Sequence, residues 1–157
     1  MAVTLTPSHY VHGDQQTDFK WMIEQPEYKS TLFIFNDNDE QFRAFLDDQT
    51  PGTSGCRDGG NNAVIRHYRC LKPPRAAGIP TGPGYVSLSH SVGDDGTVKG
   101  VIDDALEIIK SLLASGQYDQ LVYSAGASDD ELGASLFPEL GDDVKRYAVA
   151  ELRKGVQ

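Results

Sequence analysis

The clearest hydrophobic pattern in the chain covers residues 98–115, where apolar side chains recur every three or four positions. This spacing places them on one face of a helix, with acidic and basic side chains on the opposite face. Thr97 is a suitable N-cap residue, and Gly116 stands where helices often end in a left-handed glycine. The pattern therefore predicts a helix over Val98 to Ser115 that packs one face against a sheet.

Three short segments have the composition of strands: Thr31 to Asn36, Ala76 to Pro80 and Gln120 to Gly126. The first is apolar almost throughout, which is typical of a strand covered on both faces. Helical spacing recurs between and after them, at about Glu40 to Leu46, Asn62 to Arg69 and Asp143 to Lys154. This alternation predicts a three-layer α/β/α sandwich around a mixed, mostly parallel sheet.

The first thirty residues carry a weaker pattern. We expect a strand near Tyr10 to His12 and a short helix near Phe19 to Glu24. With 157 residues, no internal repeat and no long linker, residues 1–157 are expected to form a single domain.

Composition and charge narrow the choice of partners. The net charge of −9 provides no broad basic surface for DNA or RNA, so we expect no nucleic-acid partner. No apolar run is long enough to span a membrane and the N-terminus does not resemble a signal peptide, which favours a cytoplasmic protein without a membrane partner. The sequence does not indicate an oligomeric state.

The cysteines and histidines give no sign of a metal site. Cys56 and Cys70 lack CxxC spacing, so we interpret them as free thiols, with a disulfide left open as the alternative. The four histidines show no metal-ligand spacing. We therefore expect neither a metal nor a cofactor.

The segment Gly59-Gly60-Asn61-Asn62 places four poor helix formers directly before a helical pattern. An ordinary turn followed by an Asn cap is one explanation. The other is a phosphate site, in which glycines allow close backbone approach and the helix start offers free N–H groups. Arg66, one turn further on, could reach such a phosphate, or be solvated.

Similar small and polar residues follow each predicted strand, and the carboxyl ends of parallel strands meet at one edge of a sheet. Asn side chains suit ribose hydroxyls, and Thr-Gly or Ser-Ala-Gly turns expose N–H groups that suit phosphates. Each turn alone would be unremarkable. Together they predict a nucleotide or sugar-phosphate site, built from Asn36-Asp37-Asn38-Asp39, Pro80-Thr81-Gly82-Pro83-Gly84-Tyr85 and Ser124-Ala125-Gly126.

The order of these motifs resembles the macro domain, a module that binds ADP-ribose. The similar motifs are "FNDN" at the end of the first clear strand, "GGNNAVI" opening a helix, and "IPTG" after the next strand, followed by a long helix and another strand. The resemblance covers about Thr31 to Tyr123. It departs from the family in having two glycines where three are usual, and in the insertion from Asp39 to Asp58.

The resemblance implies a role for each matching residue. Asn36 and Asn38 would face the distal ribose, and Gly59 and Gly60 would lie along the pyrophosphate. Thr81, Gly82, Gly84 and Tyr85 would form a second phosphate loop, and Asp14 would contact adenine. Tyr85 or Phe137 would lie beside the base or ribose. For the neighbouring asparagines, we expect Asn61 to cap the helix and Asn62 to face the ligand.

These expectations describe a protein that binds ADP-ribose or a related NAD-derived nucleotide. One alternative is an ADP-ribosyl hydrolase in which Asp37 or Asn38 places water. The other is a sponge or sensor for a cyclic or modified ADP-ribose signal, as in a phage or bacterial defence-related protein. The candidate catalytic residues are Asp37 and Asn38, and the candidate ligand-binding residues are Asp14, Asn36, Asn38, Gly59, Gly60, Asn61, Asn62, Arg66, Thr81, Gly82, Gly84, Tyr85 and Ser124.

Overall fold

A computed structural model describes residues 2–11, 13, 16–93 and 96–157. Within these residues, four strands form one parallel sheet in the order β1-β4-β2-β3. The strands are β1 (Thr4–Ser8), β2 (Thr31–Asp37), β3 (Ala76–Pro80) and β4 (Gln120–Ser124). The sheet is therefore wholly parallel over the described residues, where the sequence predicted a mixed one.

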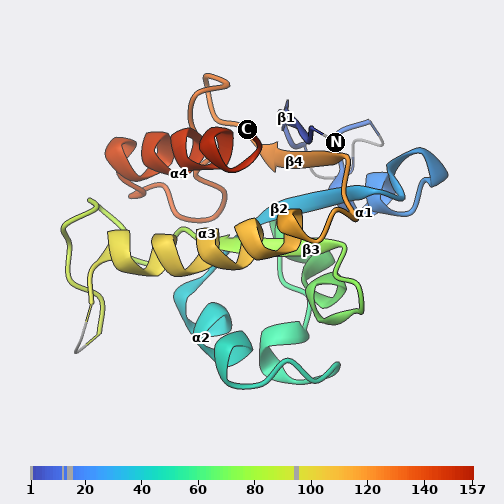
Figure 1. The fold of residues 1–157 in the computed structure, drawn as a ribbon. Coiled ribbons are helices and arrows are strands. Elements are labelled where there is room, and N and C mark those ends of the chain that lie inside the picture. The colour runs from blue at the N-terminus through green and yellow to red at the C-terminus, as the bar shows by residue number, and fades with distance from the viewer. Residues whose placement is uncertain (1, 12, 14–15, 94–95) are drawn as a thin grey trace.

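Helices lie on both faces of this sheet, which confirms the predicted three-layer α/β/α sandwich (Figure 1). One face is covered by α3 (Val98–Ala114) and α4 (Asp142–Gly155). The other face packs against α1 (Phe19–Ile23) and the 3₁₀ helix η3 (Asn61–Cys70).

The continuous apolar run in β2 follows from burial on both faces. Leu32 and Ile34 point into the core beneath α3 and α4, whereas Phe33 and Phe35 point into the core beneath α1 and η3. All seven residues of β2 are buried. The polar residues Asn36 and Asp37 form the carboxyl end of this buried central strand, which fixes their positions.

The predicted helices form close to their expected limits. Helix α3 begins after Thr97, whose side-chain oxygen accepts a hydrogen bond from the N–H of Gly100, and Gly116 follows the helix with φ +77°. The prediction for this cap and terminus is confirmed. The shorter elements are α2 (Asp39–Asp47) and the 3₁₀ helices η1 (Pro26–Tyr28) and η2 (Ser54–Cys56).

The expected strand near Tyr10 to His12 is wrong for Tyr10 and Val11, which lie outside any strand, while His12 lies outside the described residues. The first strand is β1 instead, paired with β4 from Thr4 to Ser8. Its sequence, TLTPS, is polar and contains a proline because β1 is an edge strand with a neighbour on one side. The hydrophobic pattern that reveals a central strand is therefore missing.

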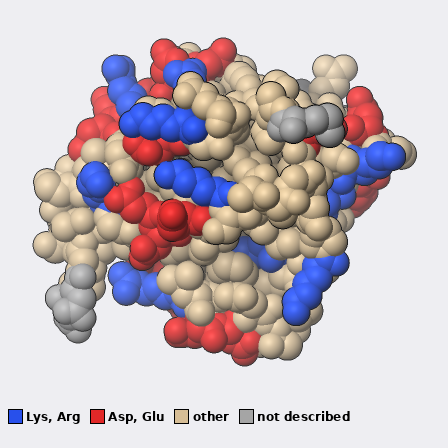
Figure 2. All heavy atoms as spheres, viewed as in Figure 1, with Lys and Arg blue, Asp and Glu red and all other residues tan. Residues whose placement is uncertain are grey.

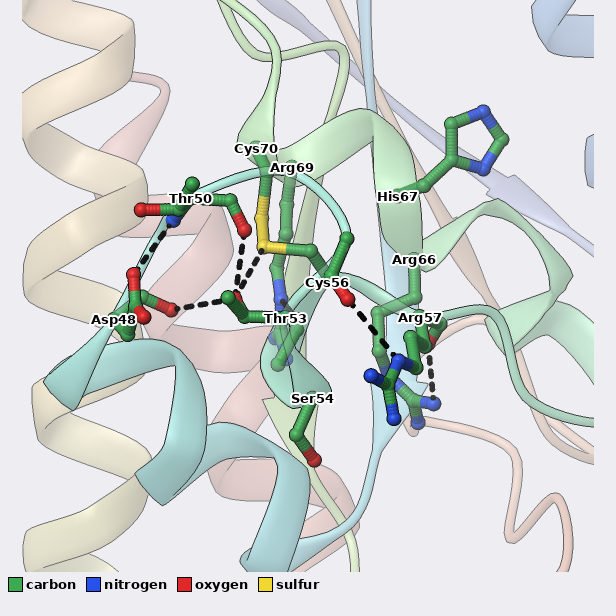
Figure 3. The surroundings of a disulfide bond; sticks show 12 residues. Asp48, Thr50, Thr53, Ser54, Cys56, Arg57, Arg66, His67, Arg69 and Cys70 are labelled. Atoms are coloured by element: carbon green, nitrogen blue, oxygen red, sulfur yellow. Dashed lines mark hydrogen bonds between the residues drawn. A yellow bond between two sulfur atoms is a disulfide. The ribbon is translucent and has the colours of Figure 1, made fainter.

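The interpretation of Cys56 and Cys70 as free thiols is also wrong. Their sulfur atoms form a disulfide across 14 residues, joining the end of η2 to the end of η3 (Figure 3). The two elements already lie against each other, because the Arg69 Nε–H donates to the carbonyl oxygen of Gly55 at 2.7 Å. Sequence spacing could not reveal this pairing, since the approach depends on how η2 folds back onto η3.

Candidate functional site

A buried ion cluster lies at the carboxyl end of β2. The Asp37 carboxylate is 1% exposed and accepts hydrogen bonds from Arg66 at Oδ1 and from Arg69 at Oδ2. Both arginines come from η3, where the three-residue turn of a 3₁₀ helix places residues three apart on the same side. The sequence pattern indicated a helix here, and the 3₁₀ form explains how both guanidinium groups reach one carboxylate.

This cluster carries an excess positive charge. Two guanidinium groups face one carboxylate, and the other partners of Arg66 and Arg69 are the neutral carbonyl oxygens of Arg57, Gly55 and Gln41. Burial lowers the pKa of Arg69, and the nearby Asp37 charge opposes that shift. Because guanidinium groups stay protonated in proteins, one positive charge remains uncompensated within the cluster.

Gly59, the first residue of the glycine pair, lies directly against Arg66 of this cluster. A Cβ added at Gly59 would be 2.6 Å from Nη1 of Arg66, so only glycine permits this approach without movement of the arginine. The N–H groups of Gly60, Asn61 and Asn62 make no hydrogen bond to any described residue, as expected at a helix start. We call residues 59–62 the first loop.

Asn61, the first residue of η3, has an unusual backbone conformation. Asn61 has φ +54°, a left-handed conformation that most L-residues avoid, and Gly60 occupies the N-cap position without a side-chain cap. The expectation that Asn61 caps this helix is therefore wrong. Such conformations are often found where a loop is held in shape for binding.

A second loop with the same features follows β4. In residues 133–137, Ser135 has φ +55°, and together with Asn61 it forms the pair of non-glycine residues with positive φ in the described chain. The N–H groups of Ala134, Ser135 and Leu136 make no hydrogen bond to the described residues. Apart from Phe137, no residue of this second loop was predicted to bind ligand, because the segment GASLF contains neither a glycine pair nor a known phosphate motif.

Asn36 ties the two loops together. Its backbone N–H donates to Asn62 Oδ1 at 2.8 Å, and its Oδ1 accepts from Asn62 Nδ2 at 2.9 Å. Its own Nδ2 donates to the carbonyl oxygen of Gly133 at 2.7 Å. Both asparagines are buried, so the structure gives them a bracing position between the loops and does not place Asn62 at an open surface as expected.

The two loops also approach each other directly, at Gly60 of the first loop and Leu136 of the second. A Cβ added at Gly60 would lie 3.7 Å from Cδ1 of Leu136, a side chain that is 61% exposed. The unpaired N–H groups of both loops therefore belong to one region at the carboxyl ends of β2 and β4. A run of such groups is a common anion-binding arrangement.

Residues 81–85, which the resemblance to macro domains predicted to form a phosphate loop, make contacts with other parts of the protein. Thr81 is buried and donates its hydroxyl to the Asp37 carbonyl oxygen, and the Gly84 N–H donates to Glu139 at 2.9 Å. The Phe137 ring covers Gly82, where a Cβ would be 2.5 Å from its Cγ. The N–H groups of Thr81 and Gly84 are therefore not the free donors expected of a phosphate loop, and Gly82 is covered by the second loop.

Two further candidates are also held by protein partners. Asn38 caps α2, since its Oδ1 accepts from the Gln41 N–H at 2.8 Å. Tyr85 is fully buried and donates its hydroxyl to Asp39, and burial together with this bond raises its pKa. An aromatic contact from Tyr85 to a base is therefore ruled out in this conformation, whereas Phe137 is only half-buried.

The remaining candidates are Ser124 and Asp14. Ser124 ends β4, is buried, and its carbonyl oxygen accepts from the Gly133 N–H at 2.9 Å. It therefore anchors the start of the second loop. Asp14 lies outside the described residues.

The geometry opposes a catalytic role for Asp37. A general base must reach the proton that it removes. Both Asp37 oxygens are engaged by guanidinium groups and shielded from solvent. Asp37 therefore does not activate water in this arrangement.

The face of the protein shown in Figure 2 has no extended basic area, because its Lys and Arg side chains are interspersed with Asp and Glu. The excess charge described above is internal and local, which suits a small anion better than a polymer.

Comparisons of the chain with protein-family models, curated proteins and solved structures find no match. No helix in the described residues is long and apolar enough to cross a bilayer. Within the same residues, no group of three or more His, Cys, Asp or Glu side chains is placed to hold a metal ion.

Proposed function

We propose that the protein binds ADP-ribose or a related NAD-derived nucleotide, with the diphosphate held between the first and second loops. The observation that carries this proposal is the pair of loops with free N–H groups above a buried positive charge. Asn61 and Ser135 bend these loops through left-handed backbone, and Asn36 fixes their separation.

A diphosphate suits this arrangement for electrostatic reasons. It carries negative charge and many acceptor oxygens, which match two rows of N–H donors. The uncompensated guanidinium charge beneath Gly59 adds attraction from below the loop. A neutral nucleoside would gain neither contribution.

The nucleoside parts would extend from the diphosphate along the rims of the loops. Phe137 and Leu136 supply apolar surface at the end of the second loop, with Leu136 largely exposed. A flat ring packs well on such surface. The choice of an ADP-ribose type of ligand, rather than any diphosphate, rests on the macro-domain resemblance of the strand-end motifs.

Binding without turnover is the form of the proposal that the site favours. The carboxylate expected to act as a base is neutralised by Arg66 and Arg69, and Asn38 is used to cap α2. A binder needs neither group to be free.

Calorimetric titration with ADP-ribose tests this function, using Ser135→Gly and Ser135→Val as a matched pair. Glycine keeps the positive φ at no steric cost, whereas a β-branched residue disfavours it. We expect Ser135→Gly to bind within about twofold of wild type and Ser135→Val to lose tenfold or more, equal to about 1.4 kcal/mol.

Adenosine serves as the ligand control, because it lacks the diphosphate, and should bind at least tenfold more weakly. Absence of binding by ADP-ribose, ADP and NAD to folded wild-type protein would overturn the proposal. Equal affinity of the two Ser135 variants would remove the second loop from it.

A further inference from the structure

The free edge of β3 faces a cavity of about 430 Å³, whose lining includes Arg69 of the buried ion cluster but no residue of the two loops. The cavity lies between α2 and α3, which flank β3 in Figure 1, and its apolar walls include Phe42, Phe45, Ile108 and Leu112. Its volume falls in the range of ordinary ligand pockets. Ala76 and Gly78 of β3 form the wall between these helices.

The register of β3 shows which backbone groups face this cavity. The carbonyl oxygen of Arg75 accepts from Phe33, and the N–H of Thr81 donates to Asp37, so odd-numbered residues of this segment point toward β2. In a parallel strand, alternate residues then point their N–H and C=O groups away. Ala76 and Gly78 therefore present a donor and an acceptor each toward the open edge.

These backbone groups have no hydrogen-bond partner among the described residues, although Ala76 is only 1% exposed. Buried backbone groups without partners are costly, so native structures pair nearly all of them. The two residues are about 6.6 Å apart along the strand, which matches the repeat of facing groups on another strand.

Charge at the mouth of the cavity indicates the orientation of an occupant. Lys72 lines the mouth at the amino end of β3, is exposed, and forms no ion pair with the described residues. Leu71 beside it is 40% exposed. A carboxylate next to Lys72 would lie at the start of β3, which is where an antiparallel strand would end.

We propose that this cavity binds the carboxyl-terminal end of a short apolar peptide, which adds to β3 as an antiparallel strand. Its backbone pairs with Ala76 and Gly78, its small apolar side chains lie between α2 and α3, and its terminal carboxylate contacts Lys72. Strand addition of this kind obtains affinity from main-chain hydrogen bonds and selectivity from the pockets for side chains.

The probe is N-acetyl-Ala-Val-Leu with a free carboxylate, titrated into the whole chain and followed by amide chemical shifts in NMR spectra. Two related peptides serve as controls: one with an amidated C-terminus, and one with every backbone nitrogen methylated. We expect saturable shifts at Ala76 and Gly78 with the first peptide, a two- to fivefold weaker affinity for the amidated peptide, and no binding of the methylated one.

Two variants with matched controls test the position. Ser111 is exposed on α3 and lines the cavity, so Ser111→Trp should fill it and reduce affinity tenfold or more, whereas Lys110→Trp on the neighbouring face should not. Lys72→Gln should lower affinity for the free-carboxylate peptide alone by two- to fivefold, while Lys29→Gln should have no effect.

A cavity that holds only water would give no saturable shifts with millimolar peptide, and this result would overturn the proposal. Equal binding of the methylated peptide, or unchanged affinity in a folded Ser111→Trp variant, would also overturn it. None of these measurements uses a nucleotide, so the outcome is independent of the proposed ADP-ribose site.

Discussion

Replacing Asp37 with Asn tests the buried ion cluster, because it removes one charge while keeping nearly the same shape. Two guanidinium groups, both almost fully buried, would then face each other without a carboxylate. Breaking a buried ion pair from one side typically costs about 3–5 kcal/mol. For a chain of this size we expect a melting temperature lower by about 6–20 °C.

Chemical denaturation with urea, supported by circular dichroism, measures the loss of unfolding free energy. Asp130→Asn is the matched control, because Asp130 pairs with Arg153 at an exposed position where a salt bridge contributes about 1 kcal/mol or less. An Asp37→Asn variant that is no less stable than this control would show that the Asp37 carboxylate does not stabilise the fold through the two arginines.

A double-mutant cycle separates the ion pair from general damage to the core. Arg69→Met removes one of the two facing charges, so adding it to Asp37→Asn should cost less than the two single changes suggest. We expect a coupling energy of about 0.5–3 kcal/mol. Additive losses would show that Asp37 and Arg69 do not stabilise the fold as a pair.

Three further predictions concern the disulfide, the carboxylate of Glu139 and the first loop. Reducing the Cys56–Cys70 disulfide should lower the unfolding free energy by about 3 kcal/mol, given the 14-residue separation, and thermal unfolding with and without reductant measures this; identical curves would contradict it. The hydrogen bond from the Gly84 N–H lowers the pKa of Glu139. The stabilising contribution of this hydrogen bond is therefore present above the ordinary carboxyl pKa and is lost as the pH falls through the lowered value. An NMR titration that gives an ordinary or raised pKa for Glu139 would disprove this. Gly60→Val should place a branched side chain beside the free N–H groups of the first loop, in van der Waals contact with Leu136, and should therefore reduce ADP-ribose affinity tenfold or more without changing the far-ultraviolet circular dichroism. Wild-type affinity in the folded variant would exclude the first loop from the site.

The central layers of the fold could be predicted because their patterns are strong. The helix from Val98 and the strand from Thr31 show clear spacing, and each is buried where the pattern requires. Strand β1 could not be found in the same way, since an edge strand with a proline needs little hydrophobicity. The disulfide depends on the packing of η2 against η3, which local sequence does not encode.

The site was only partly predictable for a related reason. The glycine pair and Asn36 lie at one strand end, as the sequence predicted, but their side-chain partners come from distant segments. Asn62 and Gly133 converge on Asn36 through tertiary folding, and Arg69 joins Arg66 at Asp37 because residues three apart lie on the same side of η3. The left-handed backbone of Ser135 has no signal in a segment that lacks glycine at that position.

The disulfide also bears on the expected cytoplasmic location. Disulfides are typical of oxidising compartments and less common in the cytosol. The disulfide therefore does not favour the expected cytoplasmic location, which stays a prediction.

The proposed binding of a nucleotide diphosphate between the two loops can be followed one backbone amide at a time. The measurement is an NMR titration of the isotope-labelled protein with ADP-ribose, observing the backbone amides of both loops. We expect saturable shifts at the N–H groups of Gly60, Asn61, Ala134 and Ser135, and little change around Ala76 and Gly78. Shifts confined to the β3 cavity, or none at either loop with millimolar ADP-ribose, would contradict the proposed binding.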